Sequence, residues 1–307
     1  MTSGLLPLIL EQVLKRGLSS PLLSYAELSE FRQQLSQGLS NNSTTYNAVF
    51  LGAQSATSGM AFLSGYQNAI RCLDQQCPND QLAAFCVSEK GIKNPRDMAT
   101  TLSLKDDEYI LSGNKGYVML LPDDLDRLYI IAKNKVDKNK AGNNNVGSLS
   151  CLHCQSHTEG LSITEPLKTP FINDIPHSGV CFDQIKIPKS NIMPCDGHAE
   201  ANKPFRYWED IHVTLAMMAW MIRDGVDNGK ELKDSKDMME LMYQLIQSFE
   251  EHPNYYSKET FPLLDRCQNK LEGYSNNLSA KSLNSWQRDR PLLQMGQKIR
   301  QLIQAKI

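Results

Sequence analysis

The sequence predicts an α+β fold in which a block of short strands lies between two helical blocks. Apolar residues recur every three or four positions in the first part of the chain, alternate in short runs in the middle, and return to helical spacing in the last part. Turn residues separate the middle runs at intervals that suit an antiparallel sheet or barrel. We therefore expect an N-terminal helical domain at 1–78, a middle β-barrel-like domain at 79–198 and a C-terminal helical bundle at 199–307.

The N-terminal domain is predicted from three stretches. Apolar spacing predicts a helix over 5–14 and a second over 25–39, which Ser24 or Ser29 could cap. The third stretch, 48–73, is rich in Ala, Gly, Ser and Met. Its small residues would permit close packing between helices.

Short apolar or alternating runs predict the strands of the middle domain, at 82–88, 100–104, 108–111, 127–133, 146–154, 161–164 and 179–187. Helical spacing returns at 211–222, 236–251 and 283–303. The apolar faces around Met217–Met221 and Met238–Met242 are larger than a small bundle can bury. They predict at least a homodimer.

Composition excludes several classes of protein. The net charge of −2 over 307 residues leaves no positive field to hold nucleic acid. No window approaches the 18 apolar residues of a membrane span, and the apolar start lacks the pattern of a signal peptide. Eight scattered cysteines are then best interpreted as reduced thiols in a cytoplasmic protein.

Ligand-type residues lie close together at Cys151, His153, Cys154 and His157. The first three fall within a predicted strand, where side chains alternate between the two faces. This alternation separates Cys154 from Cys151 and His153, and we therefore expect no metal site.

Two motifs in the middle domain resemble those of the acyl-CoA dehydrogenase family. FCVSEKG at 85–91 and EYILSGNKGYV at 108–118 resemble a strand end with aromatic-x-x-Thr-Glu-Pro and a hairpin with E-Y-x-x-x-G-x-K-x-W-I-T. GVCFDQIKIPKSNIM at 179–193 resembles the later strand V-x-F-D-x-V-x-V-P-x-x-N-x-L. The resemblance covers about 82–196, and the flanking blocks agree with the family in being helical. Family members are usually longer than this chain.

The resemblance implies a site for FAD. In the family, the Thr of the first motif hydrogen-bonds the isoalloxazine edge, and Ser88 keeps that hydroxyl. Phe85 and Val87 match the positions that flank this edge, and Tyr117 matches the aromatic residue that packs against the flavin. The alternatives are ordinary core residues at 85 and 87, a turn former at Ser88 and a strand residue at Tyr117.

The sequence also departs from the family pattern. Lys90 replaces the Pro of the first motif, and Asn94 is a partial substitute for a Ser that helps to hold phosphate or CoA. Met119 replaces a hydroxyl residue and cannot donate a hydrogen bond to the flavin. The residues after Arg223 do not match the family's R-x-x-F-G segment, which reaches the adenosine-pyrophosphate part of FAD.

The family's chemistry needs a carboxylate base over the α carbon of an acyl thioester. Glu209 lies close to one of the two places where the family has this base, with Asp210 as its neighbour. The alternative for Glu209 is a solvated acid near a helix N-terminus. The segment WQRDR at 286–290 resembles a C-terminal helix of the family, or forms a surface ion-pair cluster around a buried Trp.

The resemblance implies a flavin-dependent enzyme that oxidises an acyl thioester at its α and β carbons. A non-catalytic relative that uses the scaffold for binding is the first alternative. A relative of the flavin monooxygenase kind, which needs no carboxylate base, is the second alternative. A bound yellow chromophore would separate the two flavoproteins from the binding protein.

Overall fold

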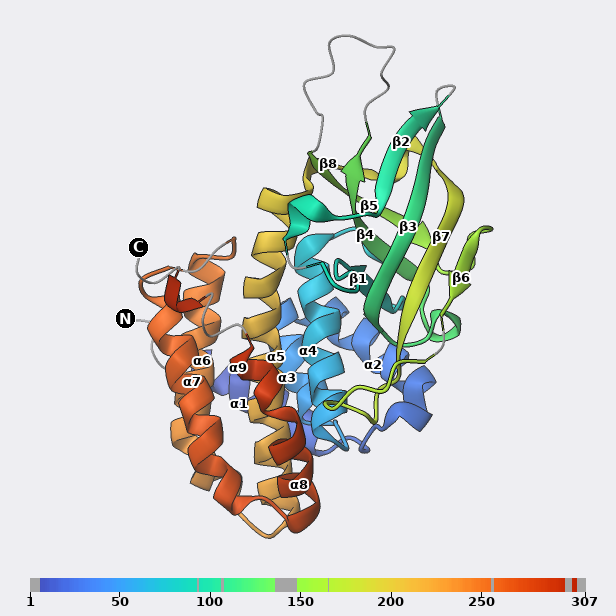
Figure 1. The fold of residues 1–307 in the computed structure, drawn as a ribbon. Helices are drawn as coiled ribbons and strands as arrows, with labels where there is room; N and C mark the ends of the chain where they lie inside the picture. Colours follow the sequence, from blue (N-terminus) through green and yellow to red (C-terminus); the bar gives the residue numbers. More distant parts are fainter. Residues whose placement is uncertain are drawn as a thin grey trace. The chain divides into compact units, whose positions relative to one another are not determined.

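The computed structural model describes residues 6–92, 94–105, 108–135, 148–164, 166–254, 257–295 and 300–302 (Figure 1). The chain forms two compact units. The helical unit contains Met1–Asp80, Pro170–Ile175 and Arg206–Ile307, and the sheet unit contains Gln81–Thr169 and Pro176–Phe205. Both predicted helical blocks thus belong to one unit. The division into three domains stays a prediction.

The longer helices are α1 (Leu6–Leu18), α2 (Leu28–Asn41), α3 (Thr44–Gly52), α4 (Ser58–Leu73), α5 (Lys203–Asp227), α6 (Lys236–Glu251), α7 (Thr260–Tyr274), α8 (Ala280–Asp289) and α9 (Pro291–Gln294). The predicted helix over 283–303 is divided between α8 and α9, and part of it lies outside the described residues. The sequence did not predict α7.

Side chains at the helix starts explain where several helices begin. Ser24 caps a 3₁₀ turn, Tyr25–Glu27, that leads into α2, and Glu27 completes a capping box. Thr57 caps α4 by accepting a hydrogen bond from the Met60 amide at 3.1 Å. Ser24, one of the two caps expected for the second helix, therefore caps the turn that precedes it.

Helix α5 lies in the core of the helical unit, and two glycines let its neighbours approach it. A Cβ at Gly52 in α3 would lie 2.3 Å from the Ala216 carbonyl oxygen. A Cβ at Gly65 in α4 would lie 2.4 Å from the Val213 Cα. The close packing expected from the small residues of 48–73 is confirmed at these two positions.

The methionine-rich faces are buried within the chain itself. The side chains of Met217, Met221, Met238 and Met242 are all 0–1% exposed. The argument that these faces need a partner subunit is therefore wrong, because neighbouring helices of the same chain cover them. The homodimer stays a prediction without this support.

The strands of the sheet unit are β1 (Ala83–Cys86), β2 (Thr101–Lys105), β3 (Glu108–Met119), β4 (Arg127–Asn134), β5 (Leu149–Gln155), β6 (Leu161–Ile163), β7 (His177–Ile187) and β8 (Ile192–Asp196). They form one sheet in the order β6-β7-β3-β2-β4-β5-β8, and β1 pairs with β4. Figure 1 shows the long strands β3 and β7 side by side.

The sheet is open, and the barrel-like prediction is wrong in this respect. In the described part of the chain, β6 and β8 at the two ends of the order do not pair with each other. The pairing is also mixed, because β1 and β2 both run parallel to β4. Short alternating runs are compatible with either pairing direction, so the sequence could not distinguish them.

Two short helices of the sheet unit follow motif segments in the sequence. A 3₁₀ turn, Pro95–Asp97, follows Asn94, and a π-helix, Gly197–Asn202, leads from β8 into α5. No helix in the described ranges has both the length and the apolar character that crossing a membrane requires.

Candidate functional site

The end of β1 presents three of the expected flavin contacts. Ser88 is exposed, and its hydroxyl makes no hydrogen bond within the described residues. Val87 is half-buried. The half-buried Phe85 ring packs against the ring of Phe205, with centroids 4.4 Å apart and an interplanar angle of 42°. The hydroxyl at the strand end is thus available, while the aromatic ring before it already has a partner.

A β-bulge in β3 brings Tyr117 to the surface beside this strand end. Gly116 and Tyr117 lie between the pairs Lys115–Val180 and Val118–Ser178, so two residues oppose one on β7. Tyr117 has a φ of 57° and is 67% exposed. A left-handed backbone conformation costs an L-residue about 1–2 kcal/mol, so the bulge holds this exposed ring at some expense of stability.

One hydrogen bond joins the strand-end segment 85–91 to the hairpin segment 108–118. The Gly116 amide donates to the Ser88 carbonyl oxygen at 2.9 Å. A Cβ at Gly116 would meet no atom within 4 Å, so the space over its backbone is open. Ser88, Gly116 and Tyr117 form what we call the open edge. The structure therefore brings together two of the residues that the resemblance assigned to flavin, Ser88 and Tyr117.

Lys115 directly precedes Gly116 in the sequence, and Glu89 directly follows Ser88. Their side chains form a buried ion pair, with Nζ and Oε1 2.8 Å apart. Burial alone would raise the pKa of Glu89, but hydrogen bonds from Lys115 and the Ala99 amide outweigh it and hold that pKa below its ordinary value. Sequence reasoning missed this pair. Lys115 follows the buried Leu111 by four positions in a strand, and this spacing was the available signal.

Asn94, the expected phosphate or CoA contact, is exposed. Its carbonyl oxygen accepts a hydrogen bond from the Asp97 amide at 2.9 Å, which closes the turn that follows. Lys93, which precedes it in the sequence, lies outside the described residues.

Glu209, the expected base, lies in α5 in the helical unit. Its side chain is 17% exposed, and its carboxylate lies 3.2 Å from the Arg206 guanidinium. The interpretation as a solvated acid is therefore wrong. Burial raises the pKa of Glu209; Arg206 opposes this shift, and the nearby Asp210 carboxylate adds to it.

Asp210 is held by two arginines. Its carboxylate lies 3.2 Å from Arg206 and 3.1 Å from Arg300, and the Asp210 and Arg300 side chains are 3% and 2% exposed. Arg300 also donates to the Gln268 side chain at 2.8 Å and to the Leu293 carbonyl at 3.0 Å. This network suits a structural role for Asp210 and leaves Glu209 as the better candidate base.

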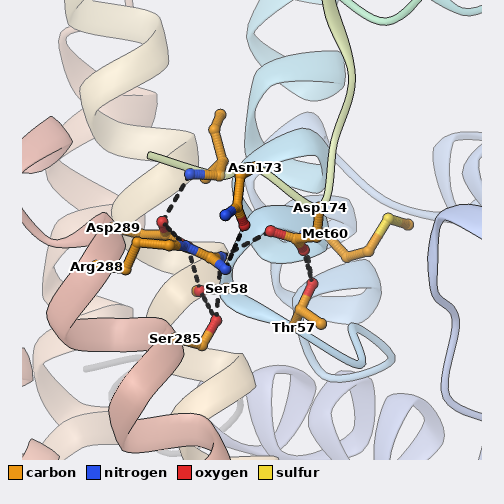
Figure 2. Close-up of polar contacts among 9 residues, drawn as sticks. Thr57, Ser58, Met60, Asn173, Asp174, Ser285, Arg288 and Asp289 are labelled. Atoms are coloured by element: carbon orange, nitrogen blue, oxygen red, sulfur yellow. Dashed lines mark hydrogen bonds and ion pairs between the residues drawn. The ribbon is translucent and has the colours of Figure 1, made fainter. Parts of the chain in front are cut away.

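The WQRDR segment belongs to a polar cluster in the helical unit (Figure 2). Asp289 is 1% exposed, and its carboxylate accepts hydrogen bonds from the Ile172 amide at 2.6 Å and the Ser58 hydroxyl at 2.5 Å. Arg288 donates to Asp289 and to Asp174, at 2.6 and 2.7 Å. Trp286 is buried as expected, and the surface ion-pair interpretation holds for Arg288 and Arg290, which are 28% and 45% exposed. It does not hold for Asp289.

Asp174 also lies at the start of α4. It accepts a hydrogen bond from the Thr57 hydroxyl (Figure 2). A Cβ at Gly59 would lie 2.5 Å from its carboxylate. A carboxylate at a helix N-terminus is stabilised by the unpaired amides and the helix dipole. The cluster thus ties segment 170–175 to α4 and α8.

Arg223 has partners within the helical unit. Its guanidinium donates to the carbonyl oxygens of Leu18, Ser20 and Ala53 at 3.1–3.4 Å and makes an ion pair with Asp227 at 2.8 Å. Arginine commonly binds the unpaired carbonyls at helix C-termini in this way. The side chain thus caps the ends of α1 and α3.

A scan against protein-family models finds no match to the sequence, and a search of curated proteins finds none. Solved structures do match the fold. Butyryl-CoA dehydrogenase from Megasphaera elsdenii matches with a TM-score of 0.71 at 12% identity, over 100% of this chain and 98% of that protein. The glutaryl-CoA complex of glutaryl-coenzyme A dehydrogenase matches at 0.65 and 14%, over 99% and 95%. The prolyl acyl carrier protein oxidase AnaB matches at 0.66 and 13%, over 100% and 99%. The chain therefore has the fold of acyl-CoA dehydrogenases and their relatives.

Proposed function

We propose that this protein binds FAD and is an oxidoreductase of the acyl-CoA dehydrogenase type, which removes hydrogen from the α and β carbons of an acyl thioester. One observation carries the proposal. The exposed ring of Tyr117 and the hydroxyl of Ser88, which has no partner among the described residues, lie on two segments that one hydrogen bond joins. The shared fold supports the same activity.

The residues of the open edge suit a flat, polar ring system. Tyr117 offers a π face for stacking, and the Ser88 hydroxyl can donate or accept a hydrogen bond at the rim of such a ring. The open space over Gly116 would let the ring approach the backbone. Phe85 and Val87 would support this contact from the partly buried side of the strand end.

The chain must supply the base for the proposed reaction. Bound FAD would supply the acceptor for the hydride that leaves the β carbon. Glu209 is our candidate for the base that removes the proton from the α carbon. Its raised pKa, caused by burial, moves it toward the range in which a base works best near neutral pH.

The fold relatives support a proposal for the substrate class. They include a complex with glutaryl-CoA and an oxidase of a prolyl acyl carrier protein. We therefore propose an acyl thioester of CoA or of a carrier protein as the substrate, with Asn94 as a contact for its phosphate. A homodimer is part of the same proposal.

A binding protein without flavin is the second candidate, and two observations favour it. Met119 is 5% exposed and offers no hydrogen-bond donor where the family has a hydroxyl. Arg223 is engaged by helix carbonyls within its own chain. A site for FAD in this protein would thus lack two of the contacts that the family provides.

The first experiment is a visible absorption spectrum of the purified protein before and after it is mixed with FAD and desalted. Flavin bands that survive desalting are the expected result. Ser88→Ala should weaken FAD binding by about tenfold, the value of one hydrogen bond to a buried polar partner. Ser190→Ala, at another exposed serine of the sheet unit, is the matched control. No retained flavin at any FAD concentration would favour the binding protein.

An assay with an artificial dye as electron acceptor then tests the chemistry. Reduction of the dye that depends on an acyl thioester supports dehydrogenation. A flavin-loaded protein that oxidises substrate only with molecular oxygen would instead favour a relative of the monooxygenase kind.

A further inference from the structure

The ion pair of Lys115 and Glu89 is buried beside the open edge. The side chains are 0% and 6% exposed. Removing two charges from water is costly, and a well-packed apolar pair is often as stable or more stable. Stability alone therefore does not explain why a lysine and a glutamate occupy these positions. The proposed chemistry uses neither side chain directly.

Three segments of the sheet unit meet at this pair. Lys115 in β3 donates to Glu89 at 2.8 Å and to the Val87 carbonyl at 3.1 Å. Glu89 accepts hydrogen bonds from the Ala99 amide at 2.7 Å and the Thr100 amide at 3.1 Å. The pair thus connects the end of β1, the segment that leads into β2, and the part of β3 just before the bulge.

Three consecutive residues at the end of β1 are anchored by this arrangement. Val87 is held through its carbonyl and Glu89 through its carboxylate, both by Lys115. Between them, Ser88 is held through its carbonyl by the Gly116 amide. The Ser88 backbone is therefore fixed on both sides while its hydroxyl faces solvent. Because Tyr117 follows Gly116, the same contacts set the start of the bulge.

We infer that Lys115 and Glu89 are positioning residues, which hold Ser88 and the Gly116–Tyr117 bulge in the arrangement that receives the planar ring of FAD. This inference rests on the proposed function. The useful property of the pair is the direction of its hydrogen bonds. An apolar pair of similar volume would fill the same space without holding the Val87 carbonyl or the two amides.

The test compares a single variant and a double variant with the wild-type protein. The single variant Lys115→Met leaves Glu89 buried and unpaired, and it is expected to lower stability. The double variant Lys115→Met/Glu89→Leu removes both charges, and its melting temperature without flavin should return to within about 4 °C of the wild type. Its affinity for FAD, measured by titration of flavin fluorescence, should stay about tenfold or more weaker, because ordering the loose edge opposes binding.

A matched control shares strand β3 with the buried pair and joins it to β7. Lys186 and Glu108 form an ion pair of the same length, 2.8 Å, with side chains that are 72% and 54% exposed. The double variant Lys186→Met/Glu108→Leu should change FAD affinity by less than about twofold, because exposed pairs contribute little. An equal loss of affinity in this control would overturn the inference.

A second readout needs no flavin. Hydrogen exchange of the Gly116 and Ala99 amides should be about tenfold faster in the buried-pair double variant than in the wild type.

Recovery of FAD affinity together with melting temperature in the double variant would overturn the inference and leave the pair a structural role. If the wild type does not bind FAD, the proposed function fails. Unchanged amide exchange would then overturn the positioning role as well, and faster exchange would support it for another ligand of the edge.

Discussion

The Gly116 amide donates a hydrogen bond to the Ser88 carbonyl oxygen at 2.9 Å, and this contact joins two motifs that lie far apart in the sequence. On one side of it lies a serine hydroxyl with no partner in the described residues. On the other side lies a tyrosine with a left-handed backbone and an exposed ring. A strained, exposed aromatic residue contributes little to the folded state. The proposed FAD site would give this position a role.

Tyr117→Gly should therefore separate stability from binding. Glycine adopts a φ of 57° without steric cost, and the tyrosine ring is 67% exposed, so little burial is lost. We expect the flavin-free variant to be as stable as the wild type or up to about 1 kcal/mol more stable, while its affinity for FAD falls by about tenfold or more. Urea unfolding and flavin titration measure the two effects.

Gln184→Gly is the control for this prediction. Gln184 is an exposed residue of β7 with a φ of 52°, so relief of strain should be similar there. FAD affinity should not change in this variant. Wild-type affinity in Tyr117→Gly would contradict the stacking role of the ring.

Glu209→Gln should abolish thioester-dependent dye reduction without unfolding the protein. Because burial raises the pKa of Glu209, the folded protein binds the Glu209 proton more tightly than the unfolded chain does. The stability that this proton contributes is present at acidic pH and is lost as the pH rises through the folded pKa. The Gln variant should thus equal or exceed the wild type in melting temperature at mildly alkaline pH, and this advantage should vanish at acidic pH.

The same shift sets the pH dependence of the reaction. The wild-type rate should fall as the pH drops through a pKa above the ordinary glutamate value, because the base must be ionised. Glu240→Gln, at an exposed position of α6, should leave both the rate and its pH profile unchanged. A wild-type profile in Glu209→Gln would exclude Glu209 as the base.

The order of helical block, strand block and helical block could be predicted because the spacing of apolar residues changes at the block boundaries and two motifs identify the strand block. The sequence could not predict that the sheet is open, since edge strands and central strands of this length share one pattern. It missed β8, whose run after Ile192 contains a proline and a cysteine. The exposed ring of Tyr117 depends on a bulge, and a bulge is set by pairing with β7 rather than by local sequence.

The ion-pair partners of Glu209 and Asp210 could not be predicted from the sequence either. Glu209 is mostly buried and does not lie at a helix N-terminus, because α5 already begins at Lys203 and the Glu209 side chain pairs with Arg206. The position of Arg300 against Asp210 joins residues 90 positions apart. No local pattern predicts such a contact, although an arginine among apolar residues near the end of the chain was visible.

Asp289→Ala should destabilise the helical unit by about 3 kcal/mol. The substitution leaves the buried Ile172 amide without its acceptor and removes an ion-pair partner of Arg288 (Figure 2). Arg290→Ala is the control, since Arg290 pairs with Glu272 where the side chains are 45% and 37% exposed. It should cost less than about 1 kcal/mol. Similar unfolding midpoints for the two variants in urea would contradict a structural role for the cluster.

Gly65→Ala and Gly273→Ala should change stability in opposite directions, although both add one methyl group to a helix. At Gly65 the new Cβ would lie 2.4 Å from the Val213 backbone, so α4 and α5 must move apart, at a cost of about 1–3 kcal/mol. At Gly273 in α7 the Cβ would meet nothing within 4 Å, and alanine should stabilise the helix by about 0.5–1 kcal/mol. Urea unfolding followed by the helical circular dichroism signal measures both. An unaffected Gly65→Ala would show that the close contact between α4 and α5 does not limit the residue at position 65. A destabilised Gly273→Ala would contradict the open space around position 273.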